Sequence, residues 1–208
     1  MRIAVLIYGR LNRCTDHYNN ILDTIGRGND IDFFLSSDNS HPWQLNDFIN
    51  LYKPVKYCND IVQYNCDFSI YPTNRPETRI HNMTCHFINK ERVFLLLKQH
   101  IEKENINYDV VISLRVDLVF YNNFDFTNLE PDTIYIPEGY DYGETCTNDQ
   151  VAYGTLPVME KYNMIFSNII HLLSSKLSVP HPESLTFANI NFHNLKTKRV
   201  NIPYHIER

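Results

Sequence analysis

The sequence YDVVISLRVDLVFY, residues 108–121, predicts the central strand of the protein. It is a short apolar run rich in valine and isoleucine, a pattern typical of a strand that is buried on both faces of an α/β sheet. Arg115 and Asp117 interrupt the run. Charged side chains are rarely buried without a partner, so we expect both at the carboxyl end of the strand, where such a sheet opens into a ligand crevice. Because strand side chains alternate, the two should point to the same side.

Predicted strands and helices alternate along the rest of the chain. This order is the signature of right-handed βαβ units, and it predicts a mostly parallel central sheet flanked by helices. We expect Asp16 to cap the first helix. The predicted strands are residues 3–8, 31–35, 55–58, 134–136 and 200–206, and the predicted helices are residues 16–25, 43–51, 86–105, 157–173 and 182–195.

Composition excludes several classes of protein. A length of 208 residues, of which 43% are hydrophobic, suits one α/β domain. The net charge of −5 and the lack of a lysine or arginine cluster argue against a nucleic-acid-binding surface. No apolar run is long enough for a signal peptide or a membrane span. The five cysteines have neither CxxC nor zinc spacing, which is typical of a reducing compartment, so we expect a cytoplasmic protein.

The charged pair at the end of the central strand suggests a site for phosphate and a metal ion. Asp117 would supply a carboxylate to a hard divalent cation, which takes oxygen ligands. Arg115, with Arg10 or Arg13 from the loop after the first strand, would hold phosphate oxygens through its fork of donors. A simpler interpretation has equal weight at this point, because the R-x-D pattern is short: Asp117 caps a turn and pairs locally with Arg115.

Five segments, taken in order, resemble a known family. They are IAVLIYGRLNR (3–13), IDFFLSS (31–37), YDVVISLRVDLVF (108–120), NDQVAYG (148–154) and HPESL (181–185). Together they resemble the GT-A fold nucleotide-sugar glycosyltransferases of capsule synthesis and of large DNA viruses, above all the chlorovirus enzymes that glycosylate the major capsid protein. The resemblance implies a single GT-A domain over residues 1–208, with a nucleotide-binding half at about 1–120 and an acceptor half at about 121–208.

The same resemblance implies an activity. A hexose or a deoxyhexose such as rhamnose would move from a nucleotide diphosphate, expected to be UDP, to a glycan hydroxyl on a viral capsid glycoprotein, with inversion and in the host cytoplasm. In this family an Asp-x-Asp at the end of a central strand binds Mn²⁺ or Mg²⁺. Here Arg115 replaces the first Asp, which leaves Asp117 as the direct ligand, and His205 is expected to complete the metal shell. The abrupt end of the sequence is also compatible with a domain of a longer protein.

The resemblance also assigns further residues to the nucleotide sugar. Gly9 permits close approach of a ligand to the backbone, Ser37 and Asp38 are expected at the base or ribose, and Lys90 is expected at a phosphate. Each has a simpler interpretation, as a turn glycine, a solvated turn or a solvated helix lysine. Arg10, Arg13 and Arg115 complete the predicted nucleotide-sugar site.

Asp149 is the predicted catalytic base. An inverting transfer needs a carboxylate that takes the proton of the acceptor hydroxyl. The simpler interpretation is a helix N-cap, and Glu138, Asp141 and Glu144 are rival bases in the preceding loop.

Two other functions remain open. The first is a nucleotide-sugar or glycan-binding domain without turnover, which is supported by Arg115 in the place of a metal ligand. The second, a nucleotidyltransferase, is disfavoured because the loop after the first strand has only one glycine and the sequence has no phosphate-binding loop motif.

Overall fold

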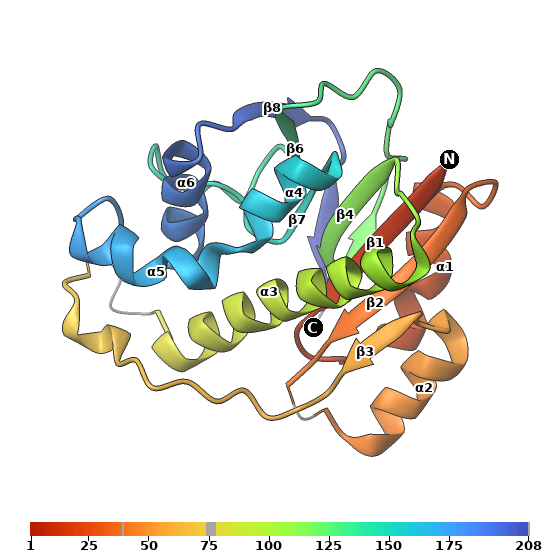
Figure 1. Ribbon diagram of the computed structural model, residues 1–208, viewed down its shortest axis with the longest axis horizontal. Helices are drawn as coiled ribbons and strands as arrows, with labels where there is room; N and C mark the ends of the chain where they lie inside the picture. Colours follow the sequence, from red (N-terminus) through yellow and green to blue (C-terminus); the bar gives the residue numbers. More distant parts are fainter. Residues whose placement is uncertain (39, 74–77, 208) are drawn as a thin grey trace.

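A seven-stranded mixed sheet forms the centre of the computed structural model, which describes residues 1–38, 40–73 and 78–207 (Figure 1). Its strand order is β3-β2-β1-β4-β7-β6-β8, and only β7 runs antiparallel to its neighbours. The predicted α/β class with a mostly parallel sheet is therefore confirmed. The strands are β1 (Arg2–Tyr8), β2 (Asp30–Ser36), β3 (Lys56–Cys58), β4 (Val110–Arg115), β6 (Thr133–Pro137), β7 (Val151–Gly154) and β8 (Lys196–Val200).

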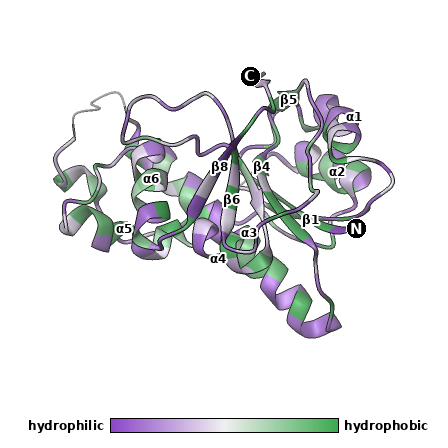
Figure 2. Cartoon of the chain, turned by 90° about the horizontal axis from the view of Figure 1, so that it is seen from above, coloured by the Kyte–Doolittle hydropathy of each residue, from purple (hydrophilic) through white to green (hydrophobic). Residues whose placement is uncertain are grey.

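Helices cover both faces of this sheet. Helices α1 (Cys14–Ile25) and α2 (Pro42–Tyr52) lie on one side, and α3 (Ile80–Glu104) and α4 (Leu156–Asn163) lie on the other (Figure 2). Two more helices, α5 (Ile165–Ser174) and α6 (Pro182–Phe192), pack beside the first half of α3. A short 3-10 helix, Phe68–Ile70, lies between β3 and α3. None of the helices in the described residues is both long and apolar enough to cross a lipid bilayer.

The sequence of β1 reflects this burial on two sides. Ile3, Val5 and Ile7 belong to the core under α1 and α2, whereas Ala4 and Leu6 belong to the core under α3 and α4. All five are at most 1% exposed. A strand covered on both faces is apolar at nearly every position, which explains why β1 reads as a continuous apolar run and β4 as one interrupted only by buried Ser113 before it ends at Arg115.

The predicted central strand is shorter than residues 108–121. Strand β4 ends at Arg115, the chain turns, and β5 (Leu118–Phe120) leaves the main sheet to pair with β9 (Tyr204–Ile206) in a two-stranded antiparallel sheet. The prediction of one strand over residues 200–206 is wrong for a similar reason. Strand β8 ends at Val200, and Pro203, which has no N–H to donate, precedes β9.

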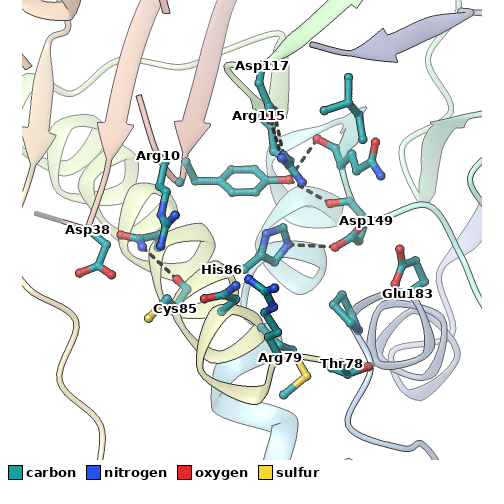
Figure 3. A pocket seen from close by; sticks show the side chains of 18 of the residues that line it. Arg10, Asp38, Thr78, Arg79, Cys85, His86, Arg115, Asp117, Asp149 and Glu183 are labelled. Carbon is teal, nitrogen blue, oxygen red and sulfur yellow. Dashed lines mark hydrogen bonds and ion pairs between the residues drawn. The ribbon is translucent and has the colours of Figure 1, made fainter. Parts of the chain in front are cut away.

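Three helix predictions also need correction. Helix α1 begins at Cys14, after Arg13 in a left-handed conformation, so Asp16 lies in the first turn and is not the cap. The single helix predicted over residues 157–173 is interrupted at Met164, which divides it into α4 and α5. Helix α3 begins at Ile80, six residues before the predicted start at residue 86. This early start brings the polar first two turns of α3 up to the carboxyl edge of the sheet (Figure 3).

Candidate functional site

A cleft of about 640 Å³ opens at the carboxyl ends of β1, β2 and β4 (Figure 3). The chain runs from β1 outward to β2 and β3, and then returns to place β4 on the other side of β1. Such a switch point is where open α/β sheets bind their ligands. Side chains that line the cleft come from the loops after these three strands, the start of α3, the segment before β7 and the start of α6. They include Gly9, Arg10, Asp38, Arg79, His86, Arg115, Asp117, Asp149 and Glu183.

Arg115 and Asp117 form a two-point ion pair at the wall of the cleft. Arg115 donates from Nε to Oδ1 of Asp117 at 2.9 Å and from Nη2 to Oδ2 at 2.5 Å. Burial disfavours the charged guanidinium, but the hydrogen bonds and charge of Asp117 outweigh burial and raise the pKa of Arg115. The two side chains meet across the turn that follows β4, and not along one face of a strand as predicted. Asp117 therefore pairs locally with Arg115, as the simpler interpretation has it, and both residues also line the cleft.

This arrangement does not fit a hard divalent cation at Asp117. Both carboxylate oxygens already accept hydrogen bonds from a guanidinium, and that positive charge repels a second cation. The predicted second ligand, His205, lies on β9, where its Nδ1 is 2.6 Å from the hydroxyl oxygen of Tyr121. His205 is not among the described residues that line the cleft. The Mn²⁺ or Mg²⁺ site therefore stays a prediction, because Asp117 is paired with Arg115 and His205 does not join it in the cleft.

Asp149 faces His86 across the cleft. Nε2 of His86 lies 3.1 Å from Oδ2 of Asp149, and the two side chains point toward each other (Figure 3). Burial alone would raise the pKa of this carboxyl, but His86, Lys90 and Arg115 together lower it, so the carboxylate is ionised. Burial lowers the pKa of His86, which favours a neutral imidazole, and the charge of Asp149 opposes this shift only in part.

The segment around Asp149 is fixed by its neighbours. Asn148 accepts a hydrogen bond from the backbone N–H of Gln150 at 3.0 Å and donates to the hydroxyl of Tyr204 at 2.7 Å. Tyr8, the last residue of β1, donates its hydroxyl proton to the backbone oxygen of Asp149 at 2.9 Å. The residue precedes a strand, β7, so the helix-cap interpretation of Asp149 is wrong.

Lys90 lies behind the cleft wall. It is 0% exposed, its Nζ is 3.4 Å from the backbone oxygen of Asp149, and it lies 3.7 Å from the ring centre of Tyr162. The interpretation as a solvated lysine is therefore wrong. Burial lowers the pKa of Lys90 to about 7, and the charge of Asp149 opposes this shift only in part. Lys90 is not among the described residues that line the cleft.

The remaining predicted residues fall into two groups. Gly9, Arg10 and Asp38 line the cleft, and the φ angle of Gly9, 99°, is one that favours glycine. Arg13 instead forms ion pairs with Asp16 and Glu207, and Ser37 is buried against Asn59; neither is among the described cleft residues. The rival base Asp141 is paired with Arg199.

Sequence reasoning missed the contribution of α3. His81, Cys85 and Asn89 recur at four-residue spacing, as do Asn82 and His86, and all five line the cleft. Polar residues at helical spacing form one face of a helix, so this pattern was a usable signal once α3 was extended to residue 80.

The comparisons with known proteins give one result. No curated protein matches the sequence. Residues 51–207, about three quarters of the chain, match a family that is described only as a domain of unknown function. The matched region contains β4 with Arg115 and Asp117, the whole of α3, and Asp149. The chain therefore belongs to the family Domain of unknown function (DUF7796).

Proposed function

We propose that the protein is a GT-A fold glycosyltransferase that moves a sugar from a nucleotide diphosphate, with UDP as the expected nucleotide, to a glycan hydroxyl. The observation that carries the proposal is the position of Arg115 and Asp117. Arg115 ends the central strand β4, Asp117 follows it, and both line the cleft at the switch point of the sheet. This is the position at which the resemblance places the Asp-x-Asp of such enzymes. The same resemblance makes the glycan of a viral capsid glycoprotein the proposed acceptor.

The charges of the cleft suit a diphosphate leaving group. Arg10, Arg79 and Arg115 all line the cleft and carry guanidinium groups, which bind phosphate oxygens through paired donors. Charge that develops on a departing diphosphate is stabilised most strongly by donors that are already in position. We therefore propose that arginines hold the diphosphate, and no step of the proposed reaction passes through a metal ion.

Asp149 is proposed as the base. Its carboxylate is ionised and lines the cleft, held in position by the contact with His86. The acceptor oxygen forms a bond to the anomeric carbon while the bond from that carbon to the diphosphate oxygen breaks. The electron pair of the broken bond leaves with the nucleotide diphosphate, and Asp149 takes the proton of the acceptor hydroxyl. Attack from the face opposite the leaving group inverts the anomeric centre.

One observation favours a second candidate function. The two-point contact occupies both carboxylate oxygens of Asp117 and two of the five N–H donors of Arg115. The remaining donors of Arg115 and those of the other cleft arginines can hold a nucleotide sugar without turnover. The second candidate is therefore a nucleotide-sugar or glycan-binding domain.

A thermal-shift screen combined with a nucleotide-release assay tests the proposal. The full chain is incubated with UDP-, GDP- and dTDP-sugars, with and without Mn²⁺. Ligand at 100 times its Kd stabilises a protein by about 2.7 kcal/mol, or roughly 5–10 °C for a domain of this size. We expect one nucleotide class to stabilise the protein and Arg115→Gln to abolish the shift.

The matched control is Arg27→Gln, since Arg27 pairs with Asp23 on the surface and lies outside the cleft. This variant should keep the full shift. Stabilisation without release of the nucleotide, in the presence of glycan acceptors, would support the binding domain. No stabilisation by any nucleotide sugar would overturn both sugar transfer and nucleotide-sugar binding.

A further inference from the structure

A second group of cleft residues has the composition of a transition-metal site. Asp38 follows β2, and His81 and Cys85 lie one turn apart on α3; all three line the cleft. One ligand atom from each, a carboxylate oxygen, an imidazole nitrogen and the sulfur, lie within 4.8 Å of one another. We propose that Asp38, His81 and Cys85 bind a zinc ion at the rim of the cleft.

The spacing between the two ligands of α3 matches zinc. The Cys85 sulfur lies 3.5 Å from Nε2 of His81. Zinc binds thiolate sulfur at about 2.3 Å and imidazole nitrogen at about 2.0–2.1 Å, so a tetrahedral angle at the metal puts these two atoms roughly 3.5 Å apart. The two side chains therefore need little movement to bind the ion together.

The segment between β3 and α3 already sets the orientation of two of the three ligands, His81 and Asp38. The hydroxyl of Tyr64 lies 2.9 Å from Nδ1 of His81, which leaves Nε2 for the metal. The backbone N–H of Val62 donates to Oδ1 of Asp38 at 2.9 Å, which leaves Oδ2. Hydrogen bonds of this kind, to the ring nitrogen and the oxygen that do not bind the metal, fix the ligands of protein metal sites.

The chemistry of the three groups selects among metals. Thiolate and imidazole ligands suit zinc, whereas Mg²⁺ and Ca²⁺ prefer oxygen ligands throughout. Burial, reinforced by the charge of Asp38, raises the pKa of the Cys85 thiol to about 11, so without metal the thiol keeps its proton. Binding of zinc replaces that S–H bond by a Zn–S bond and releases the proton to solvent.

Three protein ligands leave one position of a tetrahedral ion open. Sites of this kind keep water or a ligand atom in the fourth position, whereas structural zinc sites have four protein ligands. Because the three residues line the cleft, the open position would face the space in which a ligand binds. The zinc site does not depend on sugar transfer, and it assigns the carboxylate of Asp38 to a metal instead of a ribose.

Metal binding to the intact chain tests the proposal. The protein is stripped with a chelator, and Zn²⁺ binding is measured by competition with a chromophoric chelator. Co²⁺ is then used as a spectroscopic probe. We expect about one ion per chain and a sulfur-to-cobalt charge-transfer band. Cys85→Ser should remove this band, and Tyr64→Phe should weaken zinc binding by about 10–100-fold, the range for loss of a hydrogen bond to a ligand.

The control is Cys58→Ser, because Cys58 also lies beside a carboxylate, with its sulfur 3.3 Å from Oδ2 of Asp60. This variant should keep both the affinity and the band. If Cys85→Ser does not fold, His81→Gln, at an exposed position, should weaken zinc binding by more than Tyr64→Phe does. Absence of zinc binding, or binding that survives His81→Gln and Cys85→Ser unchanged, would overturn the proposal.

Discussion

His86 and Asp149 meet at 3.1 Å across the cleft, and this contact joins α3 to the segment that enters the antiparallel strand β7. The contact decides the charge of a buried group. Burial would favour a neutral Asp149, but the imidazole and the nearby cations hold it as a carboxylate. An ionised carboxylate can accept a proton from a bound hydroxyl, which is the property that a catalytic base needs.

Asp149→Asn is expected to lower kcat for sugar transfer by roughly 10²–10⁴-fold, the usual contribution of a general base. The amide keeps the size of the side chain but cannot take a proton. Release of nucleotide diphosphate at saturating donor measures the effect. Asp141→Asn is the control, because Asp141 is the rival carboxylate that pairs with Arg199 on the surface. Loss of turnover in Asp141→Asn, with full turnover in Asp149→Asn, would transfer the role to Asp141.

Asp117→Ala is expected to lower kcat by at least about 10²-fold, by analogy with the loss of one preorganised electrostatic contact. The variant removes the two-point contact that holds Arg115 and so misplaces a guanidinium of the cleft. Cooperative thermal unfolding of the variant verifies that it is folded. Near-normal turnover would refute a role for Asp117.

Removal of metal ions with EDTA distinguishes a diphosphate held by arginines from one held by a metal ion at Asp117. Because Arg115 holds both oxygens of Asp117, we expect turnover of the wild-type protein to persist in EDTA. Turnover that is lost in EDTA and restored by Mn²⁺, but not by Zn²⁺, would contradict this expectation and would make Asp117 a ligand of a hard cation.

Because one face of α3 is buried, substitution of two leucines of this helix is expected to change the stability of the protein by different amounts. Leu97 is 0% exposed and belongs to the core under α3 and α4, whereas Leu95 is 40% exposed. Leu97→Ala should lower the free energy of unfolding by about 2–5 kcal/mol, because it leaves a cavity. Leu95→Ala should change it by no more than about 0.5 kcal/mol. Urea denaturation of the two variants measures both values, and equal losses would contradict the packing of α3.

The strands were predictable from sequence where burial alone decides the pattern. Ile3 to Ile7 are all apolar, and Val110 to Leu114 are apolar except for buried Ser113, because both faces of the sheet are covered, so a local run of sequence carries the information. The strand ends were less predictable. The turn after Arg115 depends on the pairing of β5 with β9, which lies far away in the sequence.

The candidate site was predictable only in part, for a related reason. The R-x-D pattern is local, and both of its residues line the cleft. The contact between His86 and Asp149 depends on β7 pairing with β4 in an antiparallel direction, and no periodicity of either segment specifies that neighbour. The meeting of Asp38 with Cys85 likewise depends on how α3 lies against the end of β2.

Lys90 gives a prediction about pH. Burial lowers its pKa to about 7 in the folded protein, whereas a lysine in the unfolded chain has a pKa of about 10.4. Between these two values the unfolded chain binds a proton that the folded protein does not. The free energy of unfolding should therefore rise with pH from about 7 upward, by at most about 1.4 kcal/mol per pH unit.

Urea denaturation of the wild-type protein and of Lys90→Met, from pH 7 to 8.5, measures this contribution. Methionine has a similar length and no charge, so the variant should lack the component of the slope that Lys90 supplies. Lys103→Met should keep the wild-type slope, because the side chain of Lys103 is 73% exposed. Identical slopes in the wild type and in Lys90→Met would mean that Lys90 stays protonated in the folded protein across this range, held by Asp149 against the cost of burial.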